Sequence, residues 1–199
     1  MYFSSADSMI DLSKFNLIKK KYGYFASWAI WAEEGETPKS NIGDLSIFAS
    51  YECLKELKSD TILVALNISR GSIKTPLANF HDSNPRATDF RIRFALKNTP
   101  LWGSYMTDII KNYNELDSKK IPLYLKENPQ IEEENISLFR EELRDLGSIN
   151  PTIIAFGVEA YKILYRNFEK EFRILKIPHY AVRIKKEKYR KQVQLLTNL

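Results

Sequence analysis

The chain has 199 residues, of which 44% are hydrophobic, and it carries a formal net charge of +5 at pH 7. This length and composition suit one domain with a sizeable core, and the basic balance favours a polyanionic partner, although an ordinary solvated surface has similar counts. The single cysteine, Cys53, excludes a disulfide framework within the chain and a cysteine-ligated zinc or iron–sulfur site.

The sequence carries no targeting or membrane signal. Its first residues, MYFSSADSMIDLSKF, lack a basic region followed by an apolar one, and no run of 18 apolar residues is present. We therefore expect a soluble, cytoplasmic protein, and we expect it to be a monomer.

Residues 8–34 are predicted to be helical, because apolar residues recur there at helical spacing, with Gly23 as a weak point where the region could divide into two pieces. Trp28 and Trp31 would share one helical face and pack on a sheet. A loop is expected over residues 33–44, and residues 45–57 favour a short strand or turn that leads into a helix. The apolar run at residues 62–66 is typical of a buried strand.

The rest of the chain alternates between helical and extended patterns. Strands are expected at residues 104–110, 151–156 and 173–177, and helices at residues 87–97, 130–146, 158–169 and 184–196. In the first of these helices Phe90, Phe94 and Ala95 would face inward, whereas Arg91 and Arg93 would face elsewhere. The stretch 111–127 reads as polar and irregular, and Gly147 is a plausible helix stop. This alternation predicts an α/β domain over residues 1–199, with a parallel sheet covered on both faces and a core over residues 45–199.

Polar residues occur where the expected strands end. Asn67, Ser69 and Arg70 follow the first strand, Asp108 lies in the second, and His179 follows the last. In an open α/β sheet, ligands bind outside the carboxyl ends of the strands. The sequence therefore predicts a functional site at this edge.

These strand-end residues resemble the motifs of the uracil-DNA glycosylase superfamily over roughly residues 60–185. The segment 65–69, Ala-Leu-Asn-Ile-Ser, is similar to the Gly-x-Asn-Pro motif of the family, with Ala for Gly and Ile for Pro. Phe80, 13 residues after Asn67, is similar in placement to the aromatic residue that stacks on the flipped base. Asp108 stands where the family has an Asn that reads the base edge, and residues 179–181, His-Tyr-Ala, keep only the His of His-Pro-Ser.

This resemblance implies a three-layer α/β/α sandwich with a short central parallel sheet and a DNA glycosylase activity without metal or cofactor. Asn67 would position the attacking water, and His179 would stabilise the leaving base. Three further residues would contact the base. Five other residues would line the path of single- or double-stranded DNA, and one of them, Tyr180, is a candidate to insert into the duplex. The base-contacting residues are Phe80, Asp108 and Ser69; the DNA-contacting residues are Arg70, Lys74, Arg86, Arg183 and Tyr180.

Each of these residues also has a structural interpretation. Asn67 is a common turn residue, Phe80 is equally a loop anchor in the core, and an exposed basic residue is usually only solvated. His81, the other histidine, lies beside Phe80 and competes with His179 for the role of donor. These alternatives remain open at the level of sequence.

Asp108 bears on which base is removed. An ionised carboxylate only accepts hydrogen bonds, so it repels O4 of uracil and suits an exocyclic amine. One hypothesis is therefore a modified, cytosine-type base, such as those in phage DNA; the other is that Asp108 pairs with Lys111 or caps a turn and that uracil is still removed. The corresponding roles are phage defence and DNA repair.

Two other functions fit the same sequence. The first alternative to a glycosylase is a non-catalytic DNA-binding module with this fold. The second is a different α/β enzyme that acts on free nucleotides or nucleosides. Two histidines and one cysteine make metal-dependent hydrolysis unattractive.

Overall fold

The structure is a computed structural model in which residues 9–68, 71, 73–111, 113 and 115–197 are described. These residues form a five-stranded sheet in the order β1-β3-β2-β4-β5. Strands β3, β2, β4 and β5 run parallel, and β1 pairs with β3 in the antiparallel direction. The strands are β1 (Ala26–Trp28), β2 (Lys58–Asn67), β3 (Ser104–Ile110), β4 (Thr152–Phe156) and β5 (Arg173–Ile177). The predicted α/β class is confirmed, but the sheet is mixed rather than wholly parallel, and it is not short.

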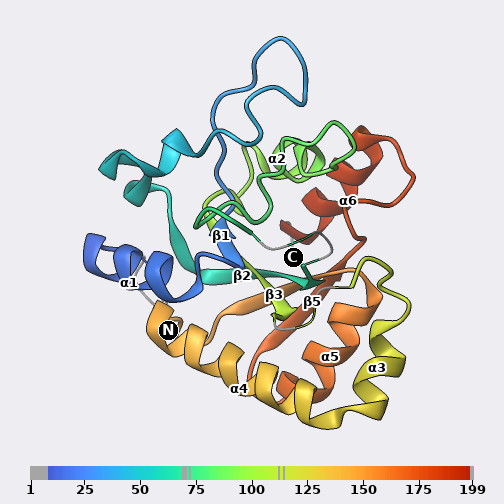
Figure 1. Cartoon of the computed structure of the whole chain (residues 1–199). Helices are drawn as coiled ribbons and strands as arrows, with labels where there is room; N and C mark the ends of the chain where they lie inside the picture. Colours follow the sequence, from blue (N-terminus) through green and yellow to red (C-terminus); the bar gives the residue numbers. More distant parts are fainter. Residues whose placement is uncertain (1–8, 69–70, 72, 112, 114, 198–199) are drawn as a thin grey trace.

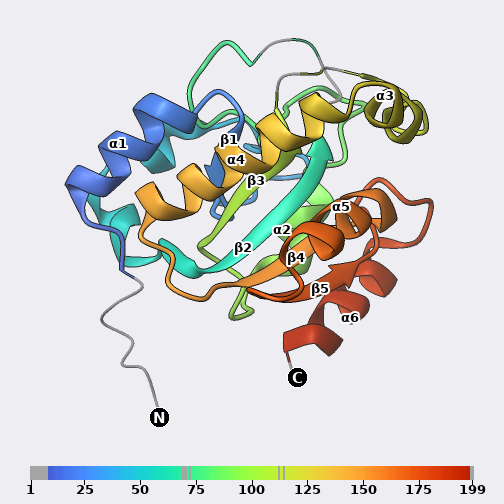
Figure 2. The same cartoon turned by 90° about the horizontal axis from the view of Figure 1, so that it is seen from below.

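Helices cover both faces of this sheet, as Figure 1 shows. One face carries α1 (Leu12–Tyr22), α3 (Ile121–Glu127), α4 (Pro129–Leu146) and α5 (Val158–Phe168). The other face carries α2 (Phe90–Leu96) and α6 (Lys186–Thr197). Figure 2 shows α1, α4 and α5 lying across the first face. The arrangement is compatible with the expected three-layer sandwich.

The central strand β2 illustrates why the sheet is buried on both sides. Ile62 and Val64 pack into the core below α1, α4 and α5, whereas Leu63 and Ala65 pack into the core below α2 and α6. Successive side chains of a strand point to opposite faces, so a strand covered on both faces must be apolar throughout. The continuous apolar run in the sequence therefore correctly predicted a buried parallel strand.

The prediction of a helical region over residues 8–34 is wrong in its second half. Helix α1 ends at Tyr22, and Ala26–Trp28 forms the antiparallel edge strand β1. Trp28 lies in the core on the α1 face and Trp31 in the core on the opposite face, so the two indoles do not share a face. Residues three positions apart lie on the same face of a helix, but they lie on opposite faces of an extended chain.

The predicted orientation of α2 is right for Ala95, which is buried, but wrong for the arginine and phenylalanine residues. Arg91 and Arg93 are only 7% and 2% exposed, whereas Phe90 and Phe94 are only partly buried. Both guanidinium groups donate to main-chain carbonyl groups from distant segments, which offsets the cost of burying their charge. The acceptors are Val182 and Ile184 for Arg91, and Ala32 and Pro38 for Arg93.

The later predictions agree closely with the structure, with two further differences. Residues 45–57 contain two short 3-10 helices, Leu45–Phe48 and Tyr51–Lys55, and the stretch expected to be irregular at 111–127 contains α3. Gly147 ends α4 with a left-handed φ of 70°, as expected. Across the described part of the chain, every helix is too short or too polar to cross a lipid bilayer.

Candidate functional site at the carboxyl ends of the strands

The carboxyl ends of β2, β3, β4 and β5 meet at one edge of the sheet. The register pairs Ala65 of β2 with Asp108 of β3, and Phe156 of β4 with Ile177 of β5. Asn67 is the last residue of β2, and His179 follows β5 by two residues. The parallel pairing thus brings together residues that are far apart in the chain.

Two cavities open at this edge and share part of their walls, and together we call them the strand-end cleft. Both are lined by Asn67, His179, Tyr180 and Ala181. The first, which we call the Asp108 cavity, has a volume of about 260 Å³ and is also lined by Asp108. The second has a volume of about 330 Å³ and extends over the start of α5.

Most of the predicted site residues line the strand-end cleft. Asn67, His179, Phe80, Asp108, Arg86 and Tyr180 all do so. Lys74 and Arg183 are exposed and line neither cavity. Ser69 and Arg70 lie outside the described residues.

The carboxamide of Asn67 is oriented by main-chain carbonyl groups. Its Nδ2 donates to the carbonyl oxygen of Glu115 at 2.9 Å, and more weakly to those of Ile68 and Tyr113 at 3.3 and 3.5 Å. Since only the nitrogen can donate to a carbonyl, these contacts assign which end of the amide is which. The other amide atom, Oδ1, is a hydrogen-bond acceptor, and no donor among the described residues contacts it.

The imidazole of His179 is held as a neutral donor. The main-chain N–H of Ala181 donates to Nδ1 at 3.1 Å, so the proton of the neutral ring is on Nε2. Burial lowers the pKa of His179 to about 4. The ring also stacks on Tyr180, with centroids 4.2 Å apart, and Tyr180 stands edge-on against Phe156. The ring is therefore fixed in position and uncharged at neutral pH.

A pH titration tests this description of His179. By NMR, the imidazole is expected to titrate near pH 4, below the usual value of about 6.5. Because the pKa is lower in the folded than in the unfolded chain, the unfolded chain binds more protons between these values. His179 should thus destabilise the fold increasingly as the pH falls from about 6.5 toward 4. A midpoint near the usual value would contradict the result, and the spectrum of a His81→Gln variant assigns the signal.

Asp108 lies on the floor of its cavity and is 2% exposed. Asn79 Nδ2 donates to Asp108 Oδ2 at 2.7 Å, and Lys111 Nζ donates to the main-chain carbonyl of Asp108. Lys111 also forms an ion pair with Glu142 at 2.9 Å. Sequence reasoning missed Asn79, whose only signal is that it is a polar residue in an apolar stretch beside Phe80.

Phe80 is both a core residue that anchors its loop and part of the wall of the candidate site, the two interpretations that the sequence left open. It is 2% exposed, belongs to the core below α2 and α6, and also forms part of the wall of the Asp108 cavity. Its φ of 66° is uncommon for a residue with a side chain, and its carbonyl accepts a hydrogen bond from Trp31 Nε1 at 3.2 Å. A backbone held in this conformation by its surroundings is frequent at functional sites.

The segment after His179 is held by the buried Arg91. Its guanidinium group donates to the carbonyls of Val182 and Ile184 and lies over the ring of Tyr189, 5.6 Å from the centroid. Sequence reasoning took this arginine for a surface residue. In the structure it positions the segment that carries the imidazole.

Replacing Arg91 is therefore expected to loosen this segment. We predict that Arg91→Met lowers the free energy of unfolding by about 1–3 kcal/mol, because two partly buried carbonyl groups lose their donors. Hydrogen exchange at the main-chain amides of Ala181 and Val182 should become faster. Arg86→Met, at an exposed position, is the matched control, and equal exchange in the two variants would contradict the prediction.

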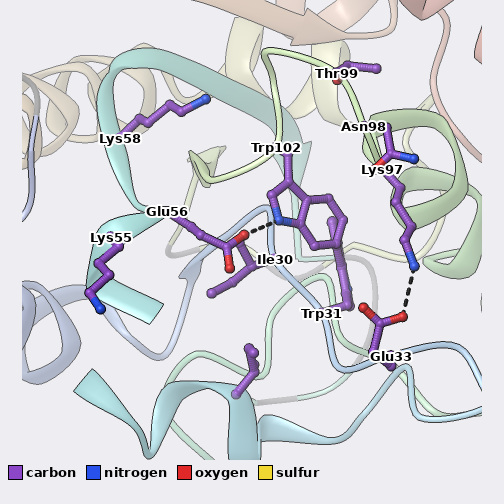
Figure 3. Close-up of a pocket in the computed structure, with 11 residues that line it drawn as sticks. Ile30, Trp31, Glu33, Lys55, Glu56, Lys58, Lys97, Asn98, Thr99 and Trp102 are labelled. Atoms are coloured by element: carbon purple, nitrogen blue, oxygen red, sulfur yellow. Dashed lines mark hydrogen bonds and ion pairs between the residues drawn. The ribbon is translucent and has the colours of Figure 1, made fainter. Parts of the chain in front are cut away.

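A larger cavity, of about 570 Å³, lies at the opposite end of the strands, where β2 and β3 begin (Figure 3). Trp102 Nε1 donates to Glu56 in its wall, and Lys97 pairs with Glu33 at 2.9 Å. None of the residues predicted as functional lines it. Since its acidic groups are already paired, the strand-end cleft is the better candidate site.

In comparisons with known proteins, no family model, no curated protein and no solved structure matches the chain. The residues of the strand-end cleft are therefore the basis for inferring a function.

Proposed function

We propose that the protein is a DNA glycosylase similar to the uracil-DNA glycosylase superfamily, which hydrolyses the N-glycosidic bond of a flipped uracil or modified, cytosine-type base. The observation that carries this proposal is that Asn67 and His179 line one cleft together with Asp108. The resemblance of the strand-end motifs supports the same activity. A role in repair, or in defence against phage DNA with modified bases, follows from either substrate.

In the proposed reaction, the bond between C1′ of the sugar and the base nitrogen breaks, and its electron pair leaves with the base. Asn67 Oδ1 accepts a hydrogen bond from a water molecule and holds the water oxygen against C1′. A carboxamide is a weak base, so Asn67 acts by placement rather than by removing the proton. The water oxygen bonds to C1′, and the proton that it loses balances the one that the departing base takes up from solvent.

His179 acts at the other end of the breaking bond. Negative charge develops on the carbonyl oxygen of the leaving base, and Nε2–H of the neutral imidazole donates a hydrogen bond to it. The Ala181 N–H and the ring of Tyr180 hold the imidazole in place before reaction. A donor that needs no rearrangement during the reaction stabilises the transition state most effectively.

The remaining residues of the cleft bind the substrate. Phe80 provides an aromatic wall, and stacking of a base on such a ring contributes about 1–3 kcal/mol. A base removed from the duplex stack requires an enclosed pocket, which the Asp108 cavity offers. Arg86 and Tyr180 in the wall of the cavity, together with the exposed residues Lys74 and Arg183, are proposed to follow the DNA backbone, in agreement with the net charge of +5.

The test is release of a free base. Purified protein is incubated with single- and double-stranded oligonucleotides that each contain one uracil or one 5-hydroxymethylcytosine, and the products are treated with alkali. We expect strand cleavage at the modified position and a free base detectable by chromatography. DNA binding without any base-less sites would defeat the catalytic proposal in favour of a DNA-binding module.

A further inference from the structure

Asn79 and Asp108 form a buried pair in the wall of the Asp108 cavity. Their residues are 5% and 2% exposed, and both line the cavity. Asn79 Nδ2 donates to Asp108 Oδ2 at 2.7 Å and to the main-chain carbonyl of Phe25 at 2.9 Å. An amide nitrogen has two hydrogens, so both donors of Asn79 are used.

This geometry favours the ionised form of Asp108. Asp108 Oδ2 accepts from Asn79, and a hydrogen bond donated to a carboxylate favours its charged state, which opposes the effect of burial. The Lys111 ammonium group donates to the main-chain carbonyl of Asp108, and its charge is paired with Glu142 at 2.9 Å. An ionised carboxylate only accepts, and Asn79 has only its oxygen left to offer. The pair therefore presents acceptors, not donors, to a bound base.

The polar groups of the cleft are thus divided by type. His179 offers a donor, Nε2–H, and the Asn79–Asp108 pair offers acceptors. A cytosine-type base matches this division, because it has a carbonyl oxygen beside the glycosidic bond and an amine that donates on the far side of the ring. Uracil has a carbonyl oxygen in place of the amine, and this oxygen would face the carboxylate with repulsion.

We propose that Asn79 is a specificity-determining residue, which holds Asp108 as an acceptor so that the cleft selects a base with an exocyclic amine and rejects its keto counterpart. The inference rests on the proposed glycosylase function and deepens it by committing to one substrate class. It assigns to Asn79 a role that its position in the sequence does not reveal.

Two matched pairs of oligonucleotides test the inference, because each pair differs only in the exocyclic group. The pairs are 5-hydroxymethylcytosine against 5-hydroxymethyluracil, and cytosine against uracil. We expect the wild-type protein to release the amine-bearing base of at least one pair faster by about tenfold or more, the scale of one well-formed contact to a base edge. Asp108→Asn should reverse the preference, since an amide nitrogen donates to the keto oxygen.

Variants of Asn79 separate a role in selectivity from a role in folding. Asn79→Ala should reduce the amine-to-keto rate ratio by about tenfold. Asn79→Asp, which keeps the size of the side chain, should also reduce it, because two carboxyl groups this close do not both ionise and Asp108 loses the amide donor that favours its charged form. Asn167→Ala is the matched control: its amide likewise donates to one carboxylate, of Glu132, and to one main-chain carbonyl, of Ile163, but it lines neither cavity of the cleft.

The outcomes distinguish this inference from the proposed function. If the wild-type protein releases the keto bases faster, the inference is overturned while the glycosylase proposal stands. If folded Asn79 variants slow both members of a pair equally, Asn79 is only structural and the inference fails. If no protein releases any base, the proposed function fails and the inference fails with it. Circular dichroism and thermal unfolding establish which variants are folded.

Discussion

Lys111→Met is expected to lower the free energy of unfolding by about 3–5 kcal/mol, the usual cost of breaking a buried ion pair. The side chains of Lys111 and Glu142 are 1% and 0% exposed, and their charged groups are 2.9 Å apart. Tyr105 also donates to Glu142 Oε1 at 2.6 Å. Removing the ammonium group leaves the Glu142 carboxylate buried without its counter-charge.

Urea denaturation measures this effect, and two further variants serve as controls. Lys111→Met combined with Glu142→Leu should recover most of the lost stability, because no buried charge is left unpaired. Lys55→Met, which breaks the exposed pair with Glu52, should cost no more than about 1 kcal/mol. Equal losses for Lys111→Met and Lys55→Met would show that burial does not govern the strength of the first pair.

His179→Gln is expected to slow base release by about 10²–10³-fold, the usual effect of removing one donor to a developing negative charge. The free energy of unfolding should change little, since glutamine retains polar atoms at a half-buried position. His81→Gln is the matched control, because His81 is hydrogen-bonded to Ser27 at 2.9 Å and lines neither cavity of the cleft.

The kinetics of the two histidine variants decide the assignment. Single-turnover rates on the preferred oligonucleotide should be reduced for His179→Gln and nearly unchanged for a folded His81→Gln protein. If His179→Gln keeps the wild-type rate, His179 is not the donor to the leaving base, and the proposed mechanism loses one of its two central residues.

The sequence by itself determined the features that depend on neighbouring residues. The apolar run at residues 62–66 and the extended pattern at residues 104–110 predicted the two central strands, and Gly147 marked the end of α4. Asn67, Asp108 and His179 were expected at one edge because the carboxyl ends of parallel strands meet there. This placement holds in the structure. The alternation of strands and helices along the chain already indicates parallel strands, and the carboxyl ends of parallel strands lie at the same end of the sheet.

Only the tertiary structure decided the features whose partners lie far along the chain. Residues 26–28 form an edge strand because β3 offers them main-chain partners, and no pattern so short distinguishes a strand from a helix. Arg91 and Arg93 are buried because distant carbonyl groups accept their hydrogen bonds, which outweighs the usual preference of arginine for water.

The chemistry of the cleft depends on the same kind of distant contact. The neutral state of His179 follows from burial and from the Ala181 N–H, and the acceptor role that we propose for Asp108 depends on Asn79, which lies on a different segment. The type of a residue determines which hydrogen bonds its side chain is able to make, but the fold determines which of these hydrogen bonds it forms within the protein. The sequence therefore indicated where the candidate site lies, and the tertiary structure decided which hydrogen bonds its side chains already make.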